Sequence, residues 1–122
     1  MDRFGQEPGW WEVDRPEPAL GVVSLLGEHD MSTAPDVEAT LFTLAREERN
    51  LVVDVSATTF LDSSVVNALY RVLAGQRDVG RRLVIQAATA ATVLQALRIT
   101  GLLDEVPLLE TRNEAIAAAL SS

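Results

Sequence analysis

Cysteine is absent from this chain of 122 residues, and histidine occurs once, at His29. The missing thiols exclude disulfide bonds, thiolate catalysis and zinc sites built from cysteine. A single imidazole likewise excludes a histidine-rich metal centre. We therefore predict that the protein has neither a metal site nor a cofactor.

Long apolar runs are missing as well. The longest apolar stretches, such as residues 51–53 and 87–94, are far shorter than a bilayer crossing requires. The first seven residues lack the basic start and the continuous apolar run of a secretory signal. The expected location is the cytoplasm, without insertion into a membrane.

Positive charge is scarce: ten basic side chains stand against eighteen acidic ones, which gives a formal net charge of -8. Phosphate backbones would repel such a chain, and no run of basic residues counters that repulsion locally. We therefore expect no direct nucleic-acid partner. Acidic surfaces mostly serve solubility, so the charge indicates little else.

A composition of 48% hydrophobic and 23% charged residues supports one compact core at this length. Residues 1–18 carry three prolines, two glycines and the pair Trp10-Trp11, and they show no sustained period. We expect residues 1–18 to be a loosely ordered extension, with the tryptophans docked onto the protein's own core. Residues 19–122 are predicted to form the domain.

Strand and helix patterns alternate from residue 20 onward. Branched apolar runs predict strands at 20–26, 51–55 and 82–86, with a further short apolar piece at 106–109. Helical periodicity and caps predict helices from Ser32 or Thr33 to about 48, from about 63 to near 80, from 90 to 100 ending at Gly101, and from the capping box Thr111–Glu114 through 120. The segment 56–61 is interpreted as a connector. The alternation predicts an α/β domain with a mostly parallel sheet.

In an open α/β sheet, functional loops lie at the carboxyl ends of the strands. The loops 27–30 and 56–64 occupy such ends, and we expect them to adjoin. Ser63 falls at a helix start, where free N–H groups and the helix dipole would stabilise a phosphate. A phosphate would add about two negative charges beside Asp62 and near Asp30. Alternatively, Asp62 or Ser63 is an ordinary helix cap, and the two roles are compatible.

The catalytic alternatives fit the sequence poorly. A Ser-His-Asp triad from Ser63 and His29 lacks the Gly-x-Ser-x-Gly elbow, and His29 in its acidic turn is interpreted as a solvated loop residue. Asp54 could pair with Asp62, but it is expected to bond backbone N–H groups at its strand end instead. Neither the Walker spacing nor the dinucleotide glycine pattern occurs. We predict that the protein is not an enzyme and has no catalytic residues.

The run LVVDVSATTFLDSS at residues 51–64 resembles the signature of STAS domains, the sulfate-transporter and anti-sigma factor antagonist modules. Residues 27–30 are similar to the family's Gly-Glu-Leu-Asp turn, residues 100–102 to its Ser-Gly-Leu, and Asn113-Glu114-Ala115 also fits. The resemblance spans about residues 20–120. It implies a single STAS-type domain, with a mixed β-sheet of four to five strands and about four α-helices packed largely on one side. It also implies an initial antiparallel strand that uses Trp10 to Val13.

The resemblance further implies that Ser63 is the phosphoacceptor of an anti-sigma factor kinase. In that family the dephosphorylated antagonist binds the anti-sigma factor and frees the sigma factor, and the phosphorylated form lets go. The implied partners are an anti-sigma factor with a histidine-kinase-like ATPase fold and a serine phosphatase of the metal-dependent type; homodimerisation stays open. The expected docking surface consists of Asp30, Thr58, Thr59, Asp62, Ser63, Ser64 and Asn67.

Two departures from the family pattern leave a second interpretation open. The usual Ser-Gly-Leu-Gly after the aspartate-serine pair is here Ser64-Val65-Val66-Asn67, and His29 replaces a common leucine. Glycines allow a partner's backbone to approach closely, so their loss bears on which partner binds. The alternative is a non-phosphorylated STAS scaffold or accessory subunit, in a stress-signalling complex or a lipid-transport system.

Overall fold

One mixed β-sheet runs through the computed structural model, which describes residues 1–88 and 92–121. The strands are β1 (Asp2–Gln6), β2 (Gly9–Glu17), β3 (Leu20–His29), β4 (Asn50–Asp54), β5 (Thr58–Leu61), β6 (Leu83–Gln86) and β7 (Leu108–Leu109). The helices are α1 (Ala34–Arg46), α2 (Ser63–Asp78), α3 (Leu94–Ile99), α4 (Leu102–Glu105) and α5 (Arg112–Leu120). The strand order is β1-β2-β3-β4-β6-β7, and β5 pairs with β3.

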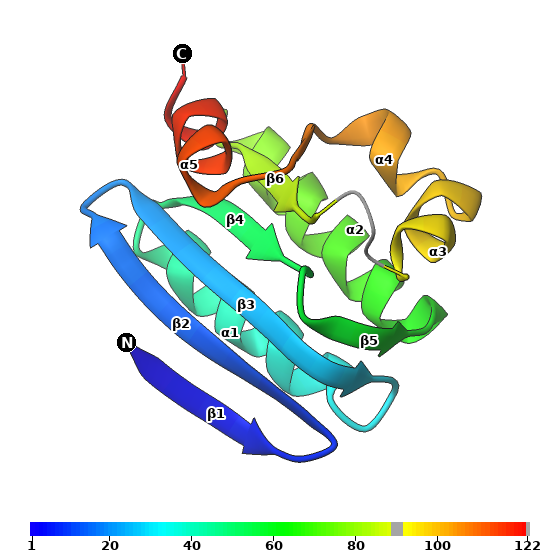
Figure 1. Cartoon of the computed structure of the whole chain (residues 1–122). Coiled ribbons are helices and arrows are strands. Elements are labelled where there is room, and N and C mark those ends of the chain that lie inside the picture. Colours follow the sequence, from blue (N-terminus) through cyan, green and yellow to red (C-terminus); the bar gives the residue numbers. More distant parts are fainter. Residues whose placement is uncertain (89–91, 122) are drawn as a thin grey trace.

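Strand β3 is the centre of this sheet (Figure 1). It pairs antiparallel with β2 on one side. On its other side, it pairs in parallel first with β4 over residues 20–24 and then with β5 over residues 27–29. The apolar residues 51–53 of β4 are buried, as expected for a strand covered on both faces.

The helices form two unequal layers. The larger core packs α1, α2, α3 and α4 against one face of the sheet. On the other face α5 covers a smaller cluster, and Figure 1 shows it alone in front of the strands. That cluster joins Leu20, Val22, Val52 and Val84 to Ala115 and Ala119. The predicted α/β class, with helices largely on one side, is confirmed.

The amino-terminal hairpin is the main correction to the predicted fold. Residues 1–18 were expected to be loosely ordered, but β1 and β2 are regular strands of the sheet. The antiparallel strand that the resemblance implied at Trp10 to Val13 is confirmed as part of β2. Burial alternates along β2, where Trp11 and Val13 are buried and Glu12 between them is half-buried. The Trp11 indole stacks on Phe4 and donates a hydrogen bond of 3.0 Å to the Thr40 hydroxyl of α1. The predicted docking of this tryptophan onto the core is confirmed.

Other element predictions need smaller corrections. The described residues form seven strands and five helices, against the predicted four to five strands and about four helices. The segment 56–61 was interpreted as a connector, yet its second half is β5 because it pairs again with β3. The helix predicted from residue 90 is α3, described from Leu94; the predicted start at Ala90 lies outside the described residues. The predicted start of α5 at Thr111 is confirmed by a complete capping box, and the predicted end of α3 at Gly101 is confirmed by the left-handed backbone of that glycine.

Two glycines allow the hairpin to approach β3 closely. A Cβ at Gly9 would lie 1.9 Å from the Glu28 carbonyl oxygen, and one at Gly27 would lie 2.0 Å from the Pro8 carbonyl oxygen. Gly27 also has a φ of +81°, which side-chain-bearing residues rarely adopt. The Glu28 N–H donates to the Pro8 carbonyl across this contact at 2.7 Å. The turn of the hairpin is therefore fixed against the carboxyl end of β3.

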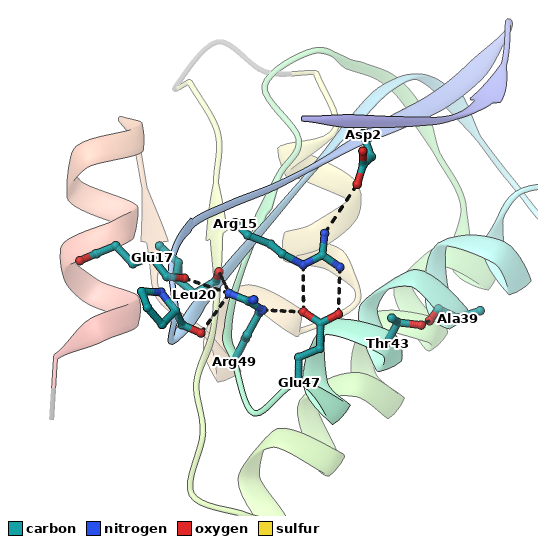
Figure 2. A network of polar contacts seen from close by, with 9 residues as sticks. Asp2, Arg15, Glu17, Leu20, Ala39, Thr43, Glu47 and Arg49 are labelled. Atoms are coloured by element: carbon teal, nitrogen blue, oxygen red, sulfur yellow. Dashed lines mark hydrogen bonds and ion pairs between the residues drawn. The ribbon is translucent and has the colours of Figure 1, made fainter.

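An ionic network holds the opposite end of the sheet, where β2 turns into β3 (Figure 2). Arg15 donates two hydrogen bonds of 2.9 Å to the Glu47 carboxylate, and Arg49 donates a third of 2.6 Å. Arg49 also donates to three backbone carbonyls, those of Glu17, Pro18 and Leu20. Hydrogen bonds from Arg15 and then Arg49 lower the pKa of Glu47 to about 2. The network joins β2 and its turn to the end of α1.

This network predicts an acid-sensitive contribution to stability. The pKa of Glu47 is lower in the folded than in the unfolded chain, so the contribution is present above about pH 4.5 and is lost as the pH falls toward 2. Glu47→Gln should lower the free energy of unfolding at neutral pH by about 1 kcal/mol or less, since the groups are partly exposed. It should also flatten the decline below pH 4.5, measured by urea denaturation at several pH values. Glu48→Gln is the control, because the Glu48 side chain is 81% exposed and its carboxylate makes only a long ion pair of 3.7 Å with Arg81. An equal effect of Glu48→Gln would contradict the assignment to Glu47.

Among the described residues, the structure contains no helix with the length and apolar character needed to cross a membrane.

Candidate functional site

The two loops selected from the sequence meet at the carboxyl end of β3. Parallel pairing of β3 with β5 sets His29 opposite Leu61. The next residue, Asp62, donates its N–H to the His29 carbonyl at 3.2 Å. Asp30 and Asp62 therefore follow two paired strand residues, and the predicted adjacency of the loops is confirmed.

Asp62 and Ser63 share the start of α2 in a defined way. Asp62 is the N-cap: its carboxylate accepts hydrogen bonds from the Ser64 N–H at 3.0 Å and from the Ser64 hydroxyl at 2.5 Å. Ser63 is the first residue of the helix and is exposed. Of the two caps considered, the aspartate is the one that caps the helix, and Ser63 remains exposed.

Asp30 repeats this arrangement in the neighbouring loop. Its carboxylate accepts from the Ser32 N–H at 2.8 Å and from the Ser32 hydroxyl at 2.5 Å. These hydrogen bonds from Ser32 lower the pKa of Asp30, so the carboxylate stays ionised well below neutral pH. Ser32 and Thr33 were the two candidate caps of α1. The Ser32 hydroxyl donates to Asp30 instead, and Thr33 occupies the N-cap position without a side-chain capping bond.

Two grooves, each with a volume of about 340 Å³, lie near the Asp62 loop, one between α1 and α2 and the other between β5 and α3. The first groove is lined by Met31, Ala34, Pro35, Glu38, Ser64, Asn67 and Arg71. The second is lined by Thr59, Phe60, Leu61, Thr92, Val93, Gln95, Ala96 and Ile99. Three large apolar side chains on these grooves are exposed: Met31 by 75%, Phe60 by 48% and Ile99 by 76%. Sequence reasoning did not select them, because an apolar residue gains significance only once its exposure is known.

Thr58 does not belong to the docking surface predicted for it. Its side chain is buried, and its hydroxyl donates to the Leu25 carbonyl at 2.7 Å. The error follows from the missed strand β5, which turns Thr58 inward while Thr59 stays exposed. Thr59, Asp62, Ser63, Ser64 and Asn67 all retain some exposure, as does Asp30.

His29 is fully buried, which corrects its interpretation as a solvated loop residue. Its Nε2 lies 3.1 Å from the Trp10 carbonyl oxygen and 3.0 Å from that of Leu26. Carbonyl oxygens only accept, so Nε2 carries the hydrogen, and Nδ1 accepts from the Thr33 hydroxyl at 2.9 Å. Burial lowers the pKa of this neutral imidazole. Both ring nitrogens are engaged, so His29 cannot serve Ser63 as a base in the folded protein.

The remaining chemistry of the site is structural. The Asp54 carboxylate accepts from the Ser56 N–H at 2.9 Å, which confirms its predicted role at the end of β4. Over residues 1–88 and 92–121, no group of three or more acidic or imidazole side chains is arranged to hold a metal ion. Of the positions that depart from the family's glycine pattern, Val65 and Val66 are buried in the core and Asn67 is exposed. Only Asn67 therefore alters the surface directly.

A family model described as "Mlab, STAS domain" matches residues 14–110. The chain belongs to the STAS domain family. A crystal structure of an anti-sigma factor antagonist from Mycobacterium paratuberculosis is 30% identical in sequence, with a TM-score of 0.75 and coverage of 91% of this chain and 93% of that one. No curated protein matches the sequence.

Two structures of SpoIIAA share the fold at lower identity. The unphosphorylated form of this anti-sigma factor antagonist is 19% identical, with a TM-score of 0.76, and the match covers 88% of this chain and 93% of that one. The phosphorylated form of the Bacillus cell fate determinant is also 19% identical, with a TM-score of 0.69 and coverage of 87% and 96%. At this identity the likeness concerns the fold alone.

The N-cap bond of Asp62 predicts a measurable loss of stability on its removal. Asp62→Ala leaves the first N–H groups of α2 without their side-chain acceptor, so the free energy of unfolding should fall by about 1 kcal/mol. Ser64→Ala, which removes the hydroxyl but keeps the capped N–H, should cost less. Urea denaturation with an unchanged slope is the measurement, and an equal loss in both variants would argue against capping by Asp62.

Burial of neutral His29 predicts a second pH dependence. The pKa of His29 is lower in the folded chain than its ordinary value of 6.5. Just below pH 6.5 the imidazole is therefore protonated in the unfolded chain but still neutral in the folded chain, which favours unfolding. Stability should therefore decline as the pH falls from about 6.5 toward about 5.5. Because this is the sole histidine, His29→Gln should remove the decline. Denaturation curves at both pH values test this, and the same decline in the variant would assign it elsewhere.

Proposed function

We propose that the protein is an anti-sigma factor antagonist that binds a kinase-type anti-sigma factor through the surface around Ser63. Phosphorylation of Ser63 switches it off and thereby regulates sigma-factor-dependent transcription. The observation that carries this proposal is the exposed Ser63 at the first position of α2, beside a serine whose hydroxyl is bonded to Asp62. The relative from Mycobacterium paratuberculosis, described as an anti-sigma factor antagonist, supports it.

The helix start tolerates a phosphate and makes it disruptive to a partner. Free N–H groups and the helix dipole at the start of α2 stabilise added negative charge, so the helix itself persists. A phosphate adds about two negative charges beside the carboxylates of Asp62 and Asp30. A partner surface that accepts a hydroxyl there would lose contact with such a concentrated charge.

The proposed contact surface combines polar and apolar side chains. Of the residues predicted from the sequence, it keeps Asp30, Thr59, Asp62, Ser63, Ser64 and Asn67, all at least partly exposed. To these the structure adds Met31 and Phe60, one on each of the two grooves. Exposed apolar anchors with a polar rim are typical of a protein-binding surface.

The partners in this proposal are an anti-sigma factor with a histidine-kinase-like ATPase fold and a metal-dependent serine phosphatase. The protein itself acts by binding, without enzymatic activity of its own, in the cytoplasm. Both nitrogens of its one imidazole are already bonded, which supports a binding role over a hydrolytic one.

The second candidate function is a STAS scaffold or accessory subunit that binds its partner without phosphorylation, in a stress-signalling complex or a lipid-transport system. The matching family model, described as "Mlab, STAS domain", favours this candidate, as does Asn67 in place of the usual glycine. Both candidates use the same surface and differ in whether Ser63 is modified.

Phosphorylation separates the two candidates. The protein is incubated with ATP and a candidate anti-sigma factor of the histidine-kinase-like ATPase fold, and intact mass is recorded. We expect a gain of one phosphate that is lost in Ser63→Ala and kept in Ser64→Ala, because Ser63 is exposed, whereas Ser64 is half-buried and its hydroxyl is bonded to Asp62. No gain with a demonstrably active kinase would favour the scaffold. A gain that survives Ser63→Ala would contradict the site, and ester hydrolysis lost in Ser63→Ala would contradict the binding role.

A further inference from the structure

We propose that His29 is a positioning residue that couples the amino-terminal hairpin to the Ser63 surface. This inference rests on the proposed function for its consequence, but its structural part stands on the contacts of His29 alone. One buried imidazole contacts β2, β3 and the start of α1, and the backbone of the same residue holds the start of α2. Loosening of the hairpin is thereby transmitted to the segment that presents Ser63.

The Nε2 side of the imidazole holds the hairpin to β3. Trp10 and Leu26 lie opposite each other in the β2–β3 pair, and both carbonyls converge on the Nε2 hydrogen of His29. The next pair, Gly9 with the left-handed Gly27, is the last of the β2–β3 ladder. The imidazole therefore supplies a donor at the point where the strand pair ends. Leucine, the family's common residue here, fills similar space but donates no hydrogen bond.

The Nδ1 side and the backbone of His29 reach the two helix starts. Nδ1 accepts from Thr33, the residue at the N-cap of α1, and the His29 carbonyl accepts from Asp62, the N-cap of α2. These two helix starts border the groove that holds Met31, Ser64 and Asn67. The relative placement of both sides of the groove thus depends on one residue.

The hairpin presses on this residue from two directions. The Trp11 ring meets the imidazole edge-on, with ring centroids 6.2 Å apart and planes at 64°. At the hairpin turn, the Gly9 backbone lies so close to Glu28 that a Cβ would collide with its carbonyl. A displacement of the hairpin therefore shifts the backbone of residues 28 and 29. The carbonyl of His29 accepts the hydrogen bond from the Asp62 N–H, so the shift reaches the start of α2.

The test compares substitutions that break the coupling at different points. His29→Leu removes both sets of imidazole bonds, and His29→Gln retains an N–H donor. Thr33→Val removes the Nδ1 partner together with the longer bond of 3.4 Å between that hydroxyl and the Asp30 carbonyl. Thr43→Val is the matched control, because its hydroxyl on the same helix bonds only the Ala39 carbonyl. The readouts are amide hydrogen exchange at Asp62 relative to the β4 amides, and the KM and kcat for phosphorylation of the intact chain by the kinase.

We expect exchange at Asp62 to accelerate roughly fivefold or more in His29→Leu and Thr33→Val, the equivalent of one buried hydrogen bond. Exchange in the β4 amides should change less, and the Thr43→Val control should match the wild type. KM should rise with little change in kcat, and His29→Gln should recover part of both effects. Equal acceleration at Asp62 and in β4 would overturn the proposal, since His29 would then merely stabilise the core.

Two further outcomes have a defined meaning. If His29→Leu does not fold, Thr33→Val decides, because the Thr33 side chain is only half-buried; wild-type exchange and KM in that variant would overturn the coupling. If the wild type is not phosphorylated at all, the proposed function fails, while exchange at Asp62 still confirms or refutes the coupling.

Discussion

The parallel pairing of β3 with two successive strands is the constraint on which the site depends. The chain leaves β4 after Asp54, turns, and returns as β5 to the carboxyl half of the same neighbour. The turn is held by the Asp54 carboxylate and by the buried hydroxyl of Thr58. Without this second pairing, the start of α2 would have no fixed relation to Asp30. The geometry around Ser63 is therefore a product of backbone hydrogen bonds rather than of side chains at the surface.

The two aspartates beside Ser63 are held by hydrogen bonds within their own loops. Each carboxylate accepts from the N–H and the hydroxyl of the serine two residues ahead, so each is fixed by its own loop. Local donors keep both carboxylates in place at little cost in side-chain freedom. The same bonds occupy the neighbouring hydroxyls, which leaves Ser63 chemically distinct from Ser64. The capping geometry thus gives the two neighbouring serines different surroundings.

Much of the fold could be predicted from local pattern, and the failures share a cause. Helical periodicity identified α1 and α2, the capping box identified α5, and the apolar run in β4 identified the central strand. Strands β1 and β5 were missed because their pairing partners lie elsewhere in the chain and their own alternation is short. Of β2, only the antiparallel segment Trp10 to Val13 was expected, and that expectation came from the family resemblance. His29 was misjudged for the same reason, because its imidazole is bonded to the carbonyl of Trp10, nineteen residues earlier in the chain. Ser63 at a helix start was predictable; the exposed Met31 and Phe60 beside it were not.

The unequal layers give the domain two levels of resistance to opening. Helix α5 rests on the sheet through Ala115 and Ala119, side chains that bury little area, whereas four helices and most large apolar residues share the opposite core. The partly buried Ile116, Ala118 and Leu120 pack against the same cluster, and Arg112 forms an ion pair with Asp14 of β2. Detachment of α5 would uncover only a few apolar side chains of the sheet. The carboxyl-terminal helix can therefore open locally while the Ser63 surface, built on the other layer, stays intact.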